Sequence, residues 1–169
     1  GDFGYLYQTR RSTVEEISRA FPVTFLLSTI AMAFSCLIAI PIGILAGIKQ
    51  NGVIDHLSRG ISILGLSIPD FFLGIIGILF FSIYLHILPV AGYKGPEYLI
   101  IPAFALSASL FAITLRLMRT SMAEVLEEEY IRTAVAKGLS KPVIIRRHVI
   151  KNAIIPVITY MGTQYGWLF

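Results

Sequence analysis

The sequence predicts an all-α integral membrane protein, a polytopic helical bundle with about four transmembrane helices. Hydrophobic residues make up 56% of the 169 residues, and the mean hydropathy of +0.76 is far above that of a soluble globular domain. The apolar residues form runs long enough to cross about 30 Å of hydrocarbon. The net charge of +4 is concentrated in one polar interval, so it indicates membrane orientation and not nucleic-acid binding.

Residues 1–20 are predicted to form an external segment that contains a short amphipathic helix. Ser12 and Glu15 have the spacing of a capping box, and Val14 and Ile17 recur on one helical face. The chain opens with glycine and stops within an apolar segment, so we interpret it as the middle of a longer protein, with spans missing at both ends.

The first predicted span covers residues 22–48, which include no charged side chain. Gly43 and Gly47 form a G-x-x-x-G pair, which predicts close contact with a neighbouring helix. Pro41 predicts a bend in this span. A short polar link, residues 49–59, then leads to the second span.

The second predicted span covers residues 60–88 and carries a carboxylate, Asp70. An ionisable side chain at membrane depth is costly and is expected to face protein or water. Two interpretations of Asp70 remain open: it caps the helical segment that follows Pro69, or it contacts a transported substrate. Together with Ser67 and, in the last span, Gln164, Asp70 is a candidate for the lining of a pathway across the membrane.

Two further spans, residues 98–117 and 152–169, complete the predicted bundle, and a Gly/Pro-rich external turn at residues 88–97 precedes the first of them. The distribution of Lys and Arg decides the orientation. Ten of the fourteen lie in the links 49–59 and 116–151, which we therefore expect on the cytoplasmic side of a cytoplasmic membrane. The other four, which then lie outside, are Arg10, Arg11, Arg19 and Lys94.

The polar interval at residues 118–151 is predicted to hold two helices separated by a glycine. The first covers residues 121–137, where glutamates come early and a lysine comes last, an order that suits the helix dipole. Gly138 ends this helix because glycine takes the left-handed conformation at little cost, and Ser140 is placed to cap the second helix. The charge alone does not distinguish a docking element from a solvated basic loop, which is the other interpretation of this interval. A short helix held by a glycine between two spans is more typical of a docking element.

The segment 133–139, TAVAKGL, resembles the EAA cytoplasmic loop of ABC-importer permeases, in the version found in the dipeptide, oligopeptide and nickel permease family. The general pattern places Glu-Ala-Ala six residues before its glycine. This sequence has Arg132, Thr133 and Ala134 there, so only Ala134 and Gly138 match strictly, as is habitual in the peptide and nickel branch. Further pairs of the same pattern are Arg147-His148, Lys151-Asn152 and Ile155-Pro156.

The resemblance covers nearly the whole chain and implies the type I ABC-importer permease (MetI-like) fold. It implies a permease subunit that pairs with a sister permease, as a heterodimer, and with two cytoplasmic ABC ATPases. An external binding protein would deliver peptides, or nickel or another metal chelate. The chain itself would bind no cofactor, because ATP and Mg²⁺ would belong to the ATPases. The implied ATPase-coupling residues are Glu127, Tyr130, Ile131, Arg132, Thr133, Ala134, Lys137 and Gly138.

The sequence contains no motif that predicts an enzyme. It has no phosphate-binding G-x-x-x-x-G-K-[ST] loop and no H-E-x-x-H zinc motif, and its three histidines are scattered among links and span ends. Two alternatives remain: a passive channel, whose basic loop would only anchor it to anionic headgroups, and a membrane enzyme that uses Asp70. The enzyme would need a second catalytic group near Asp70. A passive channel would be revealed by uptake that continues after a partner ATPase is inactivated.

Overall fold

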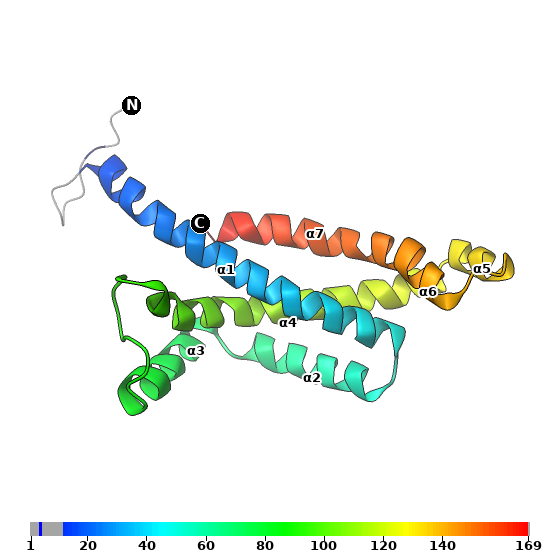
Figure 1. The fold of residues 1–169 in the computed structure, drawn as a ribbon, viewed down its shortest axis with the longest axis horizontal. Coiled ribbons are helices and arrows are strands. Elements are labelled where there is room, and N and C mark those ends of the chain that lie inside the picture. Colours follow the sequence, from blue (N-terminus) through cyan, green and yellow to red (C-terminus); the bar gives the residue numbers. More distant parts are fainter. Residues whose placement is uncertain (1–3, 5–11, 169) are drawn as a thin grey trace.

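The structure, a computed structural model, describes Gly4 and residues 12–168 as an elongated bundle of helices (Figure 1). Half of the predicted external segment, residues 1–3 and 5–11, therefore lies outside the described residues. The central helix is α4 (Ile100–Glu127), which packs against α1 (Thr13–Ile48) along most of its length. It also contacts α2 (Val53–Ser67), α3 (Asp70–Gly77) and α7 (Ile150–Trp167).

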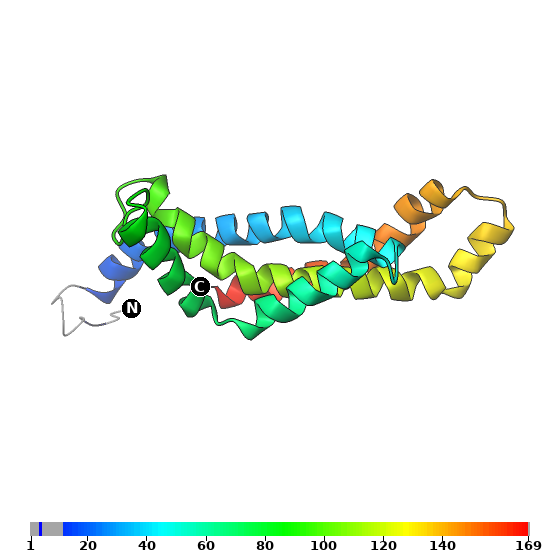
Figure 2. The ribbon, with the colours of Figure 1, turned by 90° about the horizontal axis from the view of Figure 1, so that it is seen from below.

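Shorter elements connect these helices at the two ends of the bundle (Figures 1 and 2). At one end, α3 continues into the π-helical turn η1 (Ile78–Tyr84), and the 3₁₀ helix η2 (Pro96–Leu99) precedes α4. At the other end the chain forms α5 (Glu129–Ala136), α6 (Lys141–Ile144) and the π-helical turn η3 (Ile145–Val149) before α7.

Two glycines of α1 allow its close contact with α4, as the G-x-x-x-G pair predicts. A Cβ atom at Gly43 would lie 2.7 Å from Cβ of Met118, and one at Gly47 would collide with Cβ of Met122. Both methionines are fully buried. The backbones of α1 and α4 can approach this closely only because neither glycine carries a side chain.

Two helices, Thr13–Ile48 and Pro96–Glu127, are long and apolar enough to cross a membrane. The number is up to three if α2 and the segment Asp70–Tyr84, which meet at an angle of 88°, form one broken span. The described part of the chain thus contains fewer such helices than the four we predicted. The predicted fourth span, here α7, does not reach the same hydropathy because it includes Lys151, Asn152 and Gln164.

The start of α1 differs from the prediction of a separate amphipathic helix before a span at residue 22. The helix runs without interruption from Thr13 and includes both Pro22 and Pro41. Each proline removes one backbone hydrogen bond, and long membrane helices tolerate this loss. The capping box is also wrong, because the Ser12 side chain makes no capping hydrogen bond.

The second predicted span is broken and not continuous. Helix α2 already begins at Val53, within the predicted polar link, and ends at Ser67. Ile68 is extended, with ψ of 119°, as expected for the residue before a proline. The helix then restarts at Asp70 with Pro69 as its N-cap residue, and no side chain caps it. The interpretation of Asp70 as a helix cap is therefore wrong.

The predicted helix over residues 121–137 is also broken, at Glu128. Helix α4 continues to Glu127, and Glu128 is extended, with φ of −65° and ψ of 144°. The break turns α5 so that Ile131 and Ala134 join the buried cluster around Met118 and Met122. A continuous straight helix would carry α5 away from this core, so burial of its apolar face favours the turn.

Candidate functional site

The first candidate site is the α5–α6 hairpin, residues 129–144, at one end of the bundle (Figure 2). Gly138 ends α5 with φ of +79°, in the left-handed region that the sequence predicts. Its N–H donates to the carbonyl of Val135 at 2.9 Å, and the N–H of Leu139 donates to the carbonyl of Ala134 at 3.3 Å. This pair of hydrogen bonds is the Schellman motif, which requires a left-handed residue at the glycine position.

The hairpin has an inner apolar face and an outer face that is mostly polar but also exposes Val135 and Leu139. Ile131 and Ala134 are 5% and 7% exposed and pack in the core with Ile144 and Val149. Ala134, one of the implied coupling residues, therefore places its methyl group inside this chain's own core. The predicted coupling residues that are exposed are Glu127, Tyr130, Arg132, Thr133, Lys137 and Gly138.

A hydrogen bond ties the hairpin to the start of α7. The side-chain amide of Asn152 donates to the hydroxyl of Tyr130 at 2.9 Å and to the carbonyl of His148 at 2.9 Å. Core packing holds α5 from inside, and this contact holds it from the side. The outer face of α5 is thus presented on a positioned helix and not on a free loop.

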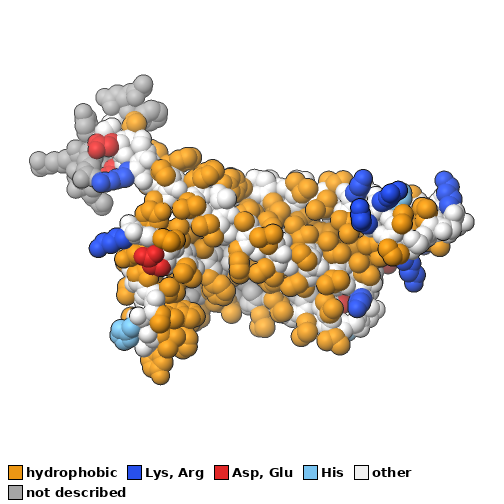
Figure 3. Space-filling view, in the orientation of Figure 1, with side chains coloured by type: hydrophobic (Ala, Val, Ile, Leu, Met, Phe, Trp, Pro, Cys, Tyr) orange, Lys and Arg blue, Asp and Glu red, His pale blue; other side chains and the backbone are white. Residues whose placement is uncertain are grey.

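Basic side chains gather at the hairpin end of the bundle (Figure 3). Exposed ones in this region are Arg132, Lys137, Lys141, Arg146, Arg147 and Lys151. Arg132 pairs with Glu129 at 3.5 Å, but both side chains are largely exposed, so the pair contributes little stability. This end of the molecule therefore presents a polar, positively charged surface.

A buried ionic cluster lies near the hairpin end, where α1, α2 and α4 meet. Asp55 is fully buried, and the Arg119 side chain of α4 donates to it twice, from Nε to Oδ1 at 2.7 Å and from Nη2 to Oδ2 at 2.9 Å. Arg59 donates to the same two oxygens at 3.2 and 2.7 Å. The backbone N–H of Asn51 completes the set at 2.9 Å. We call these four residues the Asp55 cluster.

The Asp55 cluster fixes the α1–α2 turn against α4. Each arginine binds the carboxylate with two parallel hydrogen bonds, the strongest geometry for such a pair. Loss of the carboxylate would leave the largely buried Arg119 guanidinium without its counter-charge, which typically costs about 3–5 kcal/mol. We therefore assign this cluster a positioning role: it holds the end of the bundle from which the hairpin extends.

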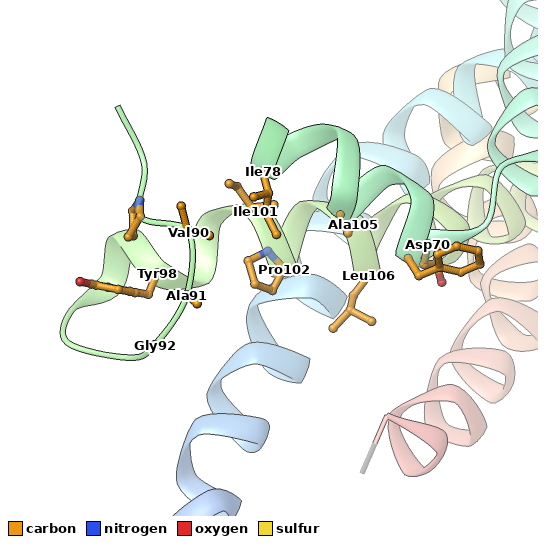
Figure 4. Close-up of a pocket in the computed structure, with 13 residues that line it drawn as sticks. Asp70, Ile78, Val90, Ala91, Gly92, Tyr98, Ile101, Pro102, Ala105 and Leu106 are labelled. Carbon is orange, nitrogen blue, oxygen red and sulfur yellow. The ribbon is translucent and has the colours of Figure 1, made fainter. Parts of the chain in front are cut away.

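The second candidate site is a cavity of about 500 Å³ at the opposite end of the bundle. It lies between α3, α4 and the segment 89–98, and Figure 4 shows Asp70 at one end and Val90 and Tyr98 at the other. Most of its lining is apolar, and Asp70 provides its carboxylate. The cavity is thus an apolar chamber with a single acidic group.

The Asp70 carboxylate is only partly hydrogen-bonded. Its Oδ2 accepts a hydrogen bond from Oγ of Ser109 on α4 at 3.0 Å. Its Oδ1 is buried and has no hydrogen-bond partner within the described part of the chain. Tyr160 of α7 lies within electrostatic range of this carboxylate. A buried carboxylate oxygen without a partner is uncommon in folded proteins.

The structure does not join the three predicted pathway residues to one another. Ser67 is exposed and donates back to the carbonyl of Ile63 in its own helix at 2.8 Å. Gln164 lies partly exposed on α7. No hydrogen bond between these side chains and Asp70 occurs among the described residues, and of the three only Asp70 lines the cavity.

Comparison with known proteins shows the family to which the chain belongs. Residues 39–169 match the family described as "Binding-protein-dependent transport system inner membrane component". The chain belongs to this family. Its members are transport components and not enzymes, their fold is that of the type I ABC-importer permeases, and the chain is accordingly a multi-pass protein of the cytoplasmic membrane.

Individual relatives are similar over almost the entire chain. The dipeptide transport system permease protein DppB of Bacillus subtilis (strain 168) is 39% identical over 163 residues, 96% of this chain and 53% of the relative. The glutathione transport system permease protein GsiC of Escherichia coli (strain K12) is 38% identical over 168 residues, 99% of this chain and 55% of the relative. The chain thus spans about half the length of the curated relatives it matches.

The matched region contains both candidate sites and also residues that sequence reasoning missed. Asp55 and Arg119 were treated only as members of polar links, and their pairing was not predicted. Opposite charges in two predicted polar links were the available signal, but helix packing decides which pairs meet. The Tyr130–Asn152 hydrogen bond depends in the same way on the turn at Glu128.

Proposed function

We propose that this chain is part of the permease subunit of an ATP-driven importer that carries short peptides across the cytoplasmic membrane. The family match and the names of the relatives, a dipeptide and a glutathione permease, support this proposal. The partners in this proposal are a sister permease, two cytoplasmic ATPases that bind ATP and Mg²⁺, and an external binding protein. Because the chain corresponds to about half of those relatives, the activity belongs to the complete subunit.

The observation that carries the proposal is the α5–α6 hairpin. Its inner face is anchored by Ile131 and Ala134, and its outer face is mostly polar and lies at the end of the apolar bundle (Figure 3). A protein that only crosses the membrane needs no positioned helix there. A helix held rigidly on one side and exposed on the other suits transmission of movement from a cytoplasmic ATPase.

The cargo in this proposal is a short peptide. Nickel or a metal chelate is the other cargo implied by the resemblance to the peptide and nickel permeases. The two named relatives favour the peptide. Within the described residues no group of three or more His, Cys, Asp or Glu side chains could hold a metal ion. Ser67, Asp70 and Gln164 remain the proposed pathway residues, with Asp70 as the one that faces a cavity.

Replacement of Gly138 by valine tests the coupling role. The left-handed φ of +79° makes any β-branched residue unfavourable by about 1 kcal/mol or more. The space around a Cβ atom there is open, so the substitution disturbs the hairpin and its outer surface and not the core. We expect the full-length subunit to assemble with its partners, with loss of peptide uptake and of ATP hydrolysis stimulated by loaded binding protein.

Gly60→Val is the matched control. Gly60 lies in α2, where a Cβ atom also meets nothing within 4 Å and φ is not left-handed. This variant should transport at the wild-type rate. If Gly138→Val assembles and transports equally well, the hairpin is only a connector. If uptake persists after inactivation of the ATPase, the protein is a passive channel.

A further inference from the structure

We propose that the cavity beside Asp70 binds the ammonium group at the N-terminus of a peptide. This inference rests on the proposed function and specifies which part of the substrate the site recognises. The observation that carries it is the half-satisfied carboxylate: Oδ2 accepts from Ser109, while Oδ1 is buried and lacks a donor. A buried carboxylate oxygen without a donor is unfavourable, so a ligand that supplies one gains affinity.

The missing donor does not come from the cavity wall. None of the described residues that line it is lysine or arginine, and Lys94 of the neighbouring segment is exposed and outside the lining. Ser109 and Tyr160 are the polar neighbours of Asp70 from α4 and α7, and the Ser109 hydroxyl already donates to Oδ2. Oδ1 receives no hydrogen bond from either hydroxyl, so the proposed donor comes from outside this chain's described residues.

The chemistry of the cavity selects a primary ammonium over a metal ion or an anion. Calcium requires six to eight oxygen ligands, and magnesium requires octahedral coordination. The lining instead offers Asp70 among mainly apolar residues such as Phe71, Ile101, Pro102 and Leu106. A carboxylate end of a peptide would meet no basic side chain there. An ammonium group can donate to the Asp70 carboxylate while the adjoining carbon atoms contact the apolar wall.

The size and position of the cavity agree with this ligand. Its volume of about 500 Å³ lies within the range of small-molecule sites. It lies at the end of the bundle opposite the hairpin, beside the segment 89–98 that the charge distribution places outside the membrane. A peptide released on that side would meet this cavity before it crosses the bundle.

A protection experiment tests the site without the need for transport. The full-length permease complex, in which Cys36 and every other native cysteine are replaced by serine, carries Leu106→Cys in the cavity wall. Alanyl-alanine should slow the reaction of this thiol with a small water-soluble thiosulfonate reagent, whereas N-acetyl-alanyl-alanine should not. Asp70→Asn keeps an acceptor for Ser109 and should raise the dipeptide concentration needed for half-protection by about tenfold or more.

Ile155→Cys is the matched control, because Ile155 is 58% exposed on α7 and does not line the cavity. Neither peptide should protect it. Equal protection of Leu106→Cys by the two peptides, or no protection by either, would overturn the proposal. So would loss of the sister subunit from the Asp70→Asn complex, since Asp70 would then pair with a basic residue of that subunit.

Uptake by the wild-type complex separates this inference from the proposed function. If the wild-type complex shows no ATP-dependent peptide uptake but alanyl-alanine protects Leu106→Cys, the proposed transport function fails and the ammonium site stands. If uptake is normal and protection is absent, the ammonium site fails and the transport function stands.

Discussion

Asp55 and Asp70 provide a comparison between the two ends of the bundle. Asp55 accepts hydrogen bonds from the backbone of Asn51 and from two arginines, and both of its oxygens are satisfied. Asp70 accepts one from Ser109, and its other oxygen is buried without a partner. A carboxylate whose bonds are complete within the chain holds elements together. A carboxylate left incomplete beside a cavity is available to a ligand.

The surroundings of the two aspartates also differ, because Asp55 lies in a closely packed region and Asp70 lies beside a cavity. The Asp55 cluster joins the α1–α2 turn to α4, where glycines bring the helices into close contact and large side chains fill the core. Asp70 stands at an 88° break between helices, next to a space of about 500 Å³. The bundle is thus closely packed at the end that carries the hairpin and open at the end that carries the cavity.

The largest expected difference between the two ends is the side of the membrane on which they lie. Single cysteines at Lys94→Cys and Lys141→Cys, in a full-length protein whose native cysteines, Cys36 included, are replaced by serine, report this difference. An impermeant maleimide should label the first in intact cells and the second only after permeabilisation, because most Lys and Arg lie at the hairpin end. Labelling of Lys141→Cys in intact cells would show that the orientation is the opposite of the predicted one.

A loss of stability is the next largest expected effect. Asp55→Asn removes the charge that Arg119 and Arg59 share, and its amide points N–H groups toward arginine donors. We expect a loss of about 3–5 kcal/mol in the free energy of unfolding, measured by denaturation of the purified protein in detergent. Arg59→Gln is the control, since that side chain is 46% exposed and its loss should cost much less. Equal losses for the two variants would contradict the assigned role of the cluster.

The sequence was informative about local features and less so about contacts between distant residues. Apolar runs predicted the helical membrane protein, and the isolated Gly138 predicted a left-handed helix end, because both follow from nearby residues. The Asp55–Arg119 pair joins residues 64 positions apart, and only packing of α1 and α2 on α4 brings them together. Residues 121–137 read as one helix because their propensity is helical throughout, whereas burial of Ile131 and Ala134 requires the turn at Glu128.

The smallest expected effect on stability is that of Asp70→Asn, and it is the sharpest test of the comparison. The amide oxygen can still accept from Ser109, and the change removes a negative charge from a buried oxygen that has no donor. The free energy of unfolding should therefore change by less than about 1 kcal/mol, or rise, because neutralisation relieves an unfavourable burial. The same denaturation measurement as for Asp55→Asn provides a direct scale. A loss as large as that of Asp55→Asn would show that Asp70 also holds the helices together. The stability measurement would then not support the view that Asp70 is available to a ligand. If Asp70→Asn changes the free energy of unfolding only slightly and also weakens protection of the cavity by a dipeptide, the two carboxylates have different roles. Asp55 is then needed for the fold and Asp70 for binding.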